Sequence, residues 1–246
     1  MNTLKTKKGY KRGYPVAILA GIEEHHAALW KVFSKVAKPE KTIPLEGTRN
    51  SLKALYNFHE AIINALRPTL KEGVRSIILA SPAKTNYAQE FINHVHEHHT
   101  WLTQGPNKAV FSTITGSGST PAQVAALTRT STFHTLIGET TTEETENLIG
   151  ILEKCLNTTN KNNVVLFSLD ETEELILKRQ KPGRLKTEYL LLTDSYLAET
   201  WEKNRLHRLM QIAANKKVKT RIVNADSPAG KRLAQLGGIV CFVQVE

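Results

Sequence analysis

The stretch from Lys219 to Val245 constrains the fold more than any other part of the sequence. It predicts a strand that ends at Val223, a helix whose N-cap is Asp226 or Ser227, and a final apolar strand. Gly237 supplies the left-handed residue that ends the helix before the final strand begins. One helix between two strands in so short a stretch is typical of an α/β domain.

The sequence before this stretch repeats the alternation of strands and helices. Short apolar runs predict strands at 15–21, 28–33, 74–80, 109–114, 164–167 and 189–192. Apolar residues at helical spacing predict helices that begin near 51, 87, 121, 144, 170 and 195. Pro68 is expected to end the first helix, Asp170 to cap the fifth, and the helix at 195–214 to bury Trp201.

The organisation along the chain favours two domains in series. Residues 129–145 are poor in large apolar side chains and rich in Thr and Glu, which places a boundary near residue 130. We therefore expect a basic N-terminal arm at 1–13, a first α/β domain at 14–130 and a second α/β domain at 131–246.

Composition points to a polyanionic partner inside the cell. The chain has 33 basic and 23 acidic residues, a formal net charge of +10, and Lys and Arg gain free energy by displacing counterions from a phosphate backbone. Cys155 and Cys241 lie in apolar patterns rather than in a paired motif, which is typical of free thiols in a reducing compartment. Apolar runs fall short of the roughly 20 residues that a membrane helix needs, and the N-terminus lacks the apolar segment of a secretion signal. The sequence predicts a cytoplasmic protein without a membrane partner.

Basic residues form three groups: the N-terminal arm, the loop 178–186 and the segment 216–221. Arg49, in the predicted loop 43–51, is the single residue most expected to approach RNA. Phosphate contacts from such residues would position the protein rather than read sequence. The candidate RNA-binding residues are Lys7, Lys8, Lys11, Arg12, Arg49, Arg179, Lys181, Arg184 and Lys186.

Two motifs raise the question of a metal or phosphate site. His94 and His98 are four residues apart on one helix face, a spacing that binds Zn²⁺ when a third ligand, such as His25, His26 or His59, comes from elsewhere. A partly solvated helix end explains the same histidines without a metal. The glycine-rich turn 115–121 precedes a helix and could hold a phosphate, but it lacks the lysine of a nucleotide-binding loop. We assign no catalytic residue, metal ligand or cofactor from the sequence.

The order of the motifs resembles the central and C-terminal domains of the family of Pelota and the archaeal and eukaryotic class 1 release factors. The resemblance is carried by Ile-Leu-Ala-Ser-Pro at 78–82, Leu-Leu-Leu-Thr-Asp-Ser-Tyr-Leu at 190–197, and Ala-Gly-x-x-Leu-x-x-Leu-Gly-Gly-Ile at 229–239. It covers the chain from about Tyr14. It implies an RNase H-like central domain, followed by a C-terminal α/β/α sandwich related to kink-turn-binding ribosomal proteins.

The resemblance also implies a function on the ribosome. Expected partners are rRNA or tRNA, and a translational GTPase or a recycling ATPase that docks on the C-terminal domain. Release factors of this family carry a Gly-Gly-Gln loop before the long helix of the central domain, whereas residues 46–51 here read Glu-Gly-Thr-Arg-Asn-Ser. The family's N-terminal domain, which enters the decoding centre, has no counterpart before Tyr14. The implied function is therefore ribosome rescue, quality control or hibernation (as in Balon-type factors), without Gly-Gly-Gln-dependent peptidyl-tRNA hydrolysis.

Two alternatives remain open at the level of sequence. An RNA-processing enzyme, a metal-dependent ribonuclease, could use the RNase H-like domain or a histidine-bound metal. Such nucleases hold two metal ions with clustered carboxylates, and the first Asp of this chain is Asp170, so we do not expect an enzyme. A free-standing RNA-binding adaptor without a ribosomal role is the second alternative.

Overall fold

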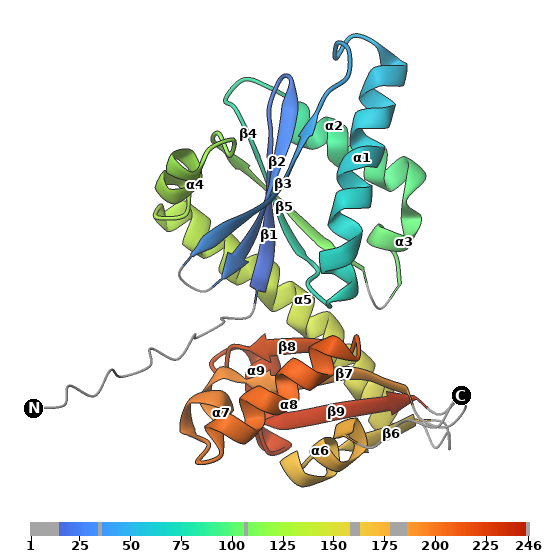
Figure 1. Cartoon of the computed structure of the whole chain (residues 1–246), viewed down its shortest axis with the longest axis vertical. Helices are drawn as coiled ribbons and strands as arrows, with labels where there is room; N and C mark the ends of the chain where they lie inside the picture. The colour runs from blue at the N-terminus through green and yellow to red at the C-terminus, as the bar shows by residue number, and fades with distance from the viewer. Residues whose placement is uncertain (1–14, 34–35, 106–107, 158–162, 178–185, 245–246) are drawn as a thin grey trace, which may run out of the picture.

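The computed structural model describes residues 15–33, 36–105, 108–157, 163–177 and 186–244. These residues form two α/β units that stack along the long axis of the molecule, each built around one sheet (Figure 1). The predicted fold class, α/β with two units in series, is confirmed. Within the described ranges, none of the helices combines the length and apolar character that a membrane span requires.

The sheet of the first unit has the strand order β3-β2-β1-β4-β5 in the described part of the chain. Strand β2 is antiparallel to both β1 and β3, whereas β4 is parallel to both β1 and β5. The strands are β1 (Pro15–Ile22), β2 (His26–Phe33), β3 (Ala37–Pro44), β4 (Ser76–Ser81) and β5 (Val110–Thr115). Because successive side chains of a strand alternate between faces, Ile18 and Ala20 face one helical layer while Ala17 and Leu19 face the other.

Helices cover both faces of this sheet. Helices α1 (Leu52–Lys71), α2 (Tyr87–His98) and α3 (Thr100–Thr103) bury one face. Helix α4 (Pro121–Leu127) and the first part of α5 (Ser131–Asn157) bury the other. The sheet is therefore apolar on both sides, as the continuous apolar runs of β1 and β4 predict.

The second unit is also a sheet between helices, with the described strands in the order β6-β9-β7-β8. Strands β7 and β8 are parallel, and β9 is antiparallel to β6 and to β7. The strands are β6 (Asn163–Leu166), β7 (Lys186–Thr193), β8 (Lys219–Val223) and β9 (Ile239–Gln244). One face packs on α6 (Leu169–Leu177), α7 (Asp194–Glu199) and α8 (Lys203–Asn215), and the other on α5 and α9 (Pro228–Gln235).

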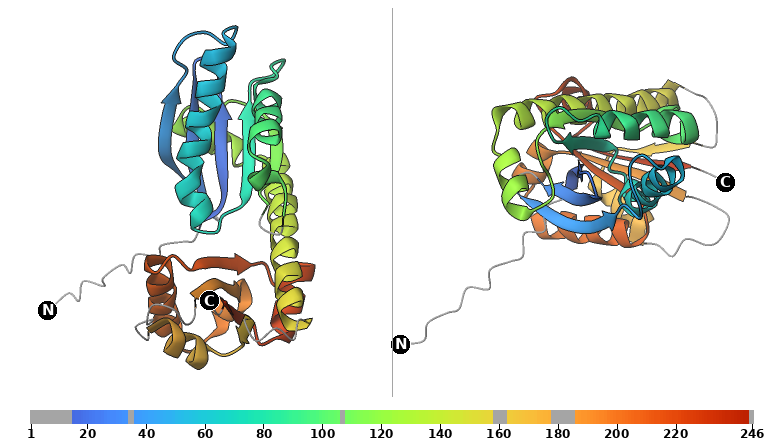
Figure 2. Two further views of the ribbon diagram at one scale, coloured as in Figure 1. Left: turned by 90° about the vertical axis from the view of Figure 1, so that its right-hand side faces the viewer. Right: turned by 90° about the horizontal axis from the view of Figure 1, so that it is seen from above.

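Helix α5 belongs to both units. Phe133 packs in the core of the first unit, whereas Leu148 and Leu152 pack against the second sheet. Figure 2 shows this helix running along the side of both units. The boundary predicted near residue 130 lies just before the helix, so part of the segment after it packs on the first sheet.

The C-terminal stretch folds as its sequence predicts. Strand β8, helix α9 and strand β9 follow one another, and the Ser227 side chain accepts a hydrogen bond from the Gly230 N–H at 3.0 Å. Gly237 has a φ of +99°, the left-handed conformation expected at the end of the helix. Gly230 is required for a different reason, because a Cβ there would lie 1.9 Å from the carbonyl oxygen of Asn224.

Some predictions for the first unit are wrong in instructive ways. Pro68 lies inside α1 instead of ending it, because a proline in the last turn removes one hydrogen bond and leaves the next, from Glu72 N–H to Pro68 O at 3.2 Å, intact. The helix predicted to begin near residue 87 ends at His98, because the backbone of His99 is not helical, and the short helix α3 follows. Strand β3 was not predicted, because six of its eight side chains are exposed and four of these six are polar, as is common on edge strands.

Trp201 is also placed wrongly by the sequence pattern. The helix predicted at 195–214 is interrupted at Thr200 and becomes α7 and α8. Trp201 lies in the connection and is fully exposed, with a relative accessibility of 101%. The position of Trp201 in the apolar pattern of the sequence therefore did not indicate burial in the core.

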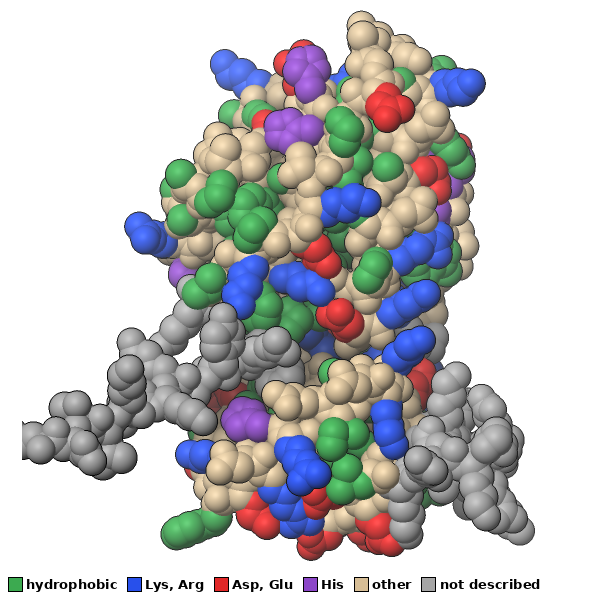
Figure 3. Space-filling model, viewed as in Figure 1, with side chains coloured by type: hydrophobic (Ala, Val, Ile, Leu, Met, Phe, Trp, Pro, Cys, Tyr) green, Lys and Arg blue, Asp and Glu red, His purple; other side chains and the backbone are tan. Residues whose placement is uncertain are grey.

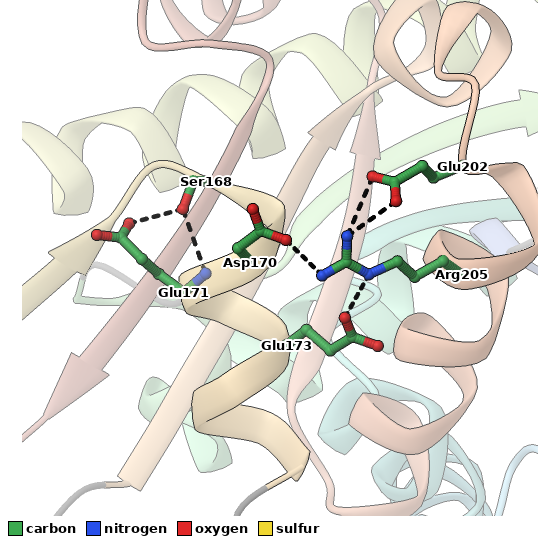
Figure 4. Close-up of polar contacts among 6 residues, drawn as sticks. All are labelled: Ser168, Asp170, Glu171, Glu173, Glu202 and Arg205. Carbon is green, nitrogen blue, oxygen red and sulfur yellow. Dashed lines mark hydrogen bonds and ion pairs between the residues drawn. The ribbon is translucent and has the colours of Figure 1, made fainter.

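The helix-capping role predicted for Asp170 at the start of α6 is wrong. The Ser168 hydroxyl, not Asp170, accepts the hydrogen bond from the Glu171 N–H, at 3.2 Å. Asp170 and Glu173 instead bind the guanidinium of Arg205 on α8 (Figure 4). Glu202 completes this group, with an oxygen 2.9 Å from Arg205. The contacts tie α6 to the beginning of α8.

Candidate functional site

The loop between β3 and α1 occupies the position where the resemblance places a Gly-Gly-Gln triplet in release factors. Gly47 has a φ of +115°, which favours glycine, and the Ser51 N–H donates to the Thr48 carbonyl at 3.0 Å. The Ser51 side chain then caps α1 by accepting from the Ala54 N–H. Local hydrogen bonds therefore fix the conformation of the loop.

Arg49 of this loop is bound within the protein. Its guanidinium donates to the backbone carbonyls of Glu23, at 2.5 Å, and Glu24, at 3.1 Å, and forms an ion pair with Glu90 at 3.0 Å. It also lies over the ring of Tyr87, 3.6 Å from the centroid, and is 12% exposed. Burial lowers the pKa of Arg49, and Glu90 opposes this shift. The structure gives this side chain the role of holding the loop against the β1–β2 turn and α2, and its contact with RNA stays a prediction.

All but one of the other candidate RNA-binding residues lie outside the described parts of the chain. This holds for Lys7, Lys8, Lys11, Arg12, Arg179, Lys181 and Arg184. Lys186 is the first residue of β7, and its side chain is not described. Their contact with RNA also stays a prediction.

The third basic group, 216–221, contains two residues whose charged side chains are bound within the molecule, Lys219 and Arg221. Lys219 binds Glu188 at 3.0 Å and the Tyr189 hydroxyl at 3.1 Å. Arg221 is 4% exposed and lies at the junction of the two units. Arg221 is therefore too buried to contact RNA, whereas contact of RNA with the other basic residues of this group stays a prediction.

Arg221 joins the two units through a buried ion pair. It donates from β8 to the carbonyl oxygens of Pro15, at 3.0 Å, and Val16, at 3.2 Å, at the start of β1. Its guanidinium lies 2.7 Å from the Glu144 carboxylate on α5, which in turn accepts from the Ser76 hydroxyl. These contacts fix the first sheet, α5 and the second sheet to one another.

A groove of about 720 Å³ lies beside this junction. Apolar side chains of the first unit, among them Trp30, Val124 and Phe133, line most of it, and Asn224 and Ser227 of the second unit close one side. The groove therefore offers an apolar surface between the units.

The glycine-rich turn 115–121 is occupied by a carboxylate of the same chain. Glu23 accepts hydrogen bonds from the Ser117 hydroxyl and, at 3.3 Å, from the Gly118 N–H. The Gly118 carbonyl accepts from the Trp30 indole at 2.7 Å, and its backbone packs directly on Gly21. The turn is thus built to join β5 to the β1–β2 hairpin, and a phosphate there would have to displace Glu23.

The histidine-rich segment forms a polar cluster with α1. The residues brought together differ from the pair, His94 and His98, that the sequence spacing suggests. One oxygen of Glu60 lies 3.1 Å from His94 Nε2 and 2.6 Å from His99 Nε2. His98 contributes a ring 4.8 Å from that of His94, but it is more exposed. Sequence spacing missed Glu60 and His99, because a pairing between α1 and the end of α2 is a tertiary contact.

Charges in this cluster are set by burial and by the shared carboxylate. Burial lowers the pKa of His94, against a hydrogen bond to Glu60 that raises it. For Glu60, hydrogen bonds from His99 and His94 outweigh burial and lower the pKa. His59, which lies beside His94 with 5.0 Å between ring centroids, has its pKa lowered to about 3 by burial. Glu60 is therefore ionised and His59 neutral at physiological pH.

Comparison with known proteins links the chain to Pelota. It is 26% identical over 188 residues to a pelota homolog of Pyrococcus furiosus, a match that covers 76% of this chain and 48% of the relative. The chain thus spans about half the length of that relative. No protein-family model matches the sequence.

The fold is similar to that of a solved archaeal Pelota in a structure described as ribosome-bound archaeal Pelota and ABCE1. The match has a TM-score of 0.54 at 16% identity and covers 98% of this chain and 65% of the other. The resemblance inferred from the sequence motifs is confirmed by both comparisons, and both α/β units take part in the match of fold.

Proposed function

We propose that this protein is a ribosome-associated translation factor that acts by binding, in the rescue or quality control of stalled ribosomes or in ribosome hibernation. The observation that supports this most strongly is that 98% of the chain matches the fold of a ribosome-bound archaeal Pelota. The sequence similarity to a pelota homolog points in the same direction. The place of action is the ribosome in the cytoplasm.

The positive charge of the protein supports RNA as its binding partner. The formal net charge is +10, and on the face drawn in Figure 3 Lys and Arg side chains gather around the junction of the two units. Asp and Glu side chains gather at the far end of the second unit. An uneven distribution of charge of this kind orients a protein on a polyanion with its basic region toward the polyanion. The candidate residues of the N-terminal arm and of the loop 178–186, which lie outside the described residues apart from Lys186, add to the positive charge of the chain.

The loop 46–51 supports binding without peptidyl-tRNA hydrolysis. It has no Gly-Gly-Gln sequence, and Arg49 ties it to the β1–β2 turn and to Glu90. Without that triplet, the loop lacks the sequence with which release factors of the family that the chain resembles place a water molecule on the peptidyl-tRNA ester. The proposed mechanism is therefore occupancy.

The second unit is the proposed docking site for a protein partner, a translational GTPase or a recycling ATPase. The archaeal Pelota of similar fold was described together with ABCE1. Trp201 is fully exposed on the second unit, and exposed aromatic side chains are frequent anchors of protein interfaces. Asp and Glu side chains gather at the far end of this unit, which makes that end less favourable for RNA than the junction of the two units.

Co-sedimentation with purified ribosomes tests the proposal. We expect the protein to pellet with ribosomes at low salt and to be released as salt rises, because phosphate contacts release counterions. Replacing Arg179, Lys181 and Arg184 together by Glu should weaken pelleting at least about 10-fold. The matched control replaces Lys53, Lys203 and Lys231, three exposed lysines outside the predicted groups, by Glu.

The outcomes separate the proposed function from its alternatives. A protein that stays in the supernatant at low salt contradicts the proposal. Crosslinks to free tRNA or mRNA without pelleting would indicate a free-standing RNA-binding adaptor. Equal losses in the two triple variants would show that net charge alone, rather than the loop 178–186, determines binding.

A further inference from the structure

We propose that Glu60, His94 and His99 form a binding site for one divalent transition-metal ion of the Zn²⁺ class. The cluster offers two imidazole nitrogens and one carboxylate oxygen, and these three ligand atoms lie within 4.8 Å of one another. Two histidines and a carboxylate form a donor set that suits Zn²⁺ and its neighbours in the first transition series. The site is independent of the proposed ribosomal function.

The spacing of the ligand atoms is close to that of a metal site. With metal–ligand distances near 2.0–2.1 Å, ligand atoms of a tetrahedral site lie about 3.3 Å apart. Here His94 Nε2 is 3.1 Å and His99 Nε2 is 2.6 Å from the same Glu60 oxygen. An ion therefore needs the His99–Glu60 pair to open by roughly 0.7 Å. That is a side-chain movement rather than a rearrangement of helices.

The surroundings hold the ligands and leave one side open. His94 and His99 are buried, whereas Glu60 is partly exposed and gives access from solvent. The ring of Tyr56 packs edge-on against His94 and His98. The fourth ligand would be water or His98, whose ring lies 4.8 Å from that of His94.

A second polar atom supports the inference. His59 Nε2 is buried and has no hydrogen-bond partner among the described residues, although buried polar atoms are nearly always paired. Its ring lies 5.0 Å from the ring of His94. The proposed ligands therefore lie beside a further imidazole whose Nε2 has no partner among the described residues.

The metal would connect elements that are separate in sequence. Glu60 lies on α1, His94 on α2, and His99 at the break between α2 and α3. An ion at this point would clamp α2 and α3 onto α1, so we expect it to stabilise the first unit.

Trp101 gives the proposal a specific signature. Its indole N–H donates to His99 Nδ1 at 3.3 Å, so the proton of the neutral His99 ring is on Nε2, where Glu60 accepts it. A metal on Nε2 requires that proton to move to Nδ1, which then can no longer accept from Trp101. Because Trp101 is partly exposed, its indole has solvent to turn toward. Metal binding should therefore break this hydrogen bond and change the fluorescence of Trp101.

The experiment uses the tag-free full chain after removal of metals with a chelator. Co²⁺ absorption reports the coordination geometry, and competition between the protein and a chromophoric chelator gives the affinity for Zn²⁺. We expect one ion per chain and a fluorescence change that is lost in Trp101→Phe. Trp101→Phe should also bind Zn²⁺ more tightly than the wild type, because no hydrogen bond competes at His99.

Variants identify the ligands. Glu60→Gln and His99→Gln should each weaken Zn²⁺ binding about 100-fold or more. A loss of this size exceeds the effect expected from changing a residue that only surrounds the metal ligands. His96→Ala, an exposed histidine of the same helix, is the matched control and should bind as the wild type does. Circular dichroism confirms that each variant is folded.

Thermal denaturation of the wild type tests the site without any variant. At Zn²⁺ concentrations about 100 times Kd, we expect Tm to rise by roughly 5–10 °C. The proposal is overturned if the wild type binds no ion and its Tm does not change. It is also overturned if Glu60→Gln and His99→Gln bind as tightly as His96→Ala.

Discussion

The buried pair between Arg221 and Glu144 makes the strongest prediction for stability. Their side chains are 4% and 2% exposed, and the guanidinium also donates to the carbonyls of Pro15 and Val16. Arg221→Met keeps the apolar stem but leaves the Glu144 carboxylate buried with Ser76 as its remaining hydrogen-bond partner. Removing one member of a buried pair costs about 3–5 kcal/mol, and we expect a loss in this range.

A double variant separates the buried charge from the loss of packing. Glu144→Gln removes the charge and keeps the shape, so Arg221→Met combined with Glu144→Gln should be about 0.5–3 kcal/mol more stable than the sum of the single effects predicts. Guanidinium chloride unfolding, followed by circular dichroism and by tryptophan fluorescence, measures these differences. The reasoning is refuted if Arg221→Met costs less than about 1 kcal/mol, or if the double variant loses the full sum of the two single effects.

Three further predictions concern single residues. Gly230→Ala should cost more than about 2 kcal/mol of unfolding free energy, since its Cβ would lie 1.9 Å from the Asn224 oxygen, whereas Gly150→Ala, in the open middle of α5, should stabilise by about 0.5–1 kcal/mol; similar effects at both sites in urea denaturation would contradict this. Burial raises the pKa of Cys241 to about 12, and the thiolate is the reactive form, so at pH 8 a thiol reagent should modify the native protein at Cys155 first and reach Cys241 on unfolding; equal rates would argue against the burial. Trp201→Ala should change stability by less than about 0.5 kcal/mol, while Trp30→Ala, which removes a buried ring and its bond to Gly118, should cost about 3–5 kcal/mol, and thermal melts compare the two.

Local signals predicted the parts of the fold that local chemistry determines. Ser227 and Gly237 delimit α9 because a capping hydroxyl and a left-handed glycine act within a few residues. Strand β3 was not predicted because its side chains show no apolar pattern. The strand forms because its backbone pairs with that of β2, which is a tertiary contact. Trp201 was misplaced because apolar spacing does not show where a helix breaks.

The candidate sites show the same division. The spacing of the histidines indicated a candidate metal site from the sequence alone. The partners of His94, however, are Glu60 on α1 and His99, which lies beyond the end of α2. Arg49 could be recognised as a charged loop residue, while its contacts with Glu23 and Glu90 depend on how the β1–β2 turn and α2 pack around the loop. Likewise, nothing in the segment 216–221 distinguishes Arg221, which is buried between the units, from its exposed neighbour Lys217.

A cryo-EM reconstruction of stalled ribosomes incubated with the protein tests the central claim most directly. We predict density for both α/β units on the ribosome, with the loop 46–51 and Arg49 at the end of the first unit directed toward tRNA, and the second unit beside a protein partner or its binding place. Ribosomes without such density, at protein concentrations that saturate binding in sedimentation, would contradict the account.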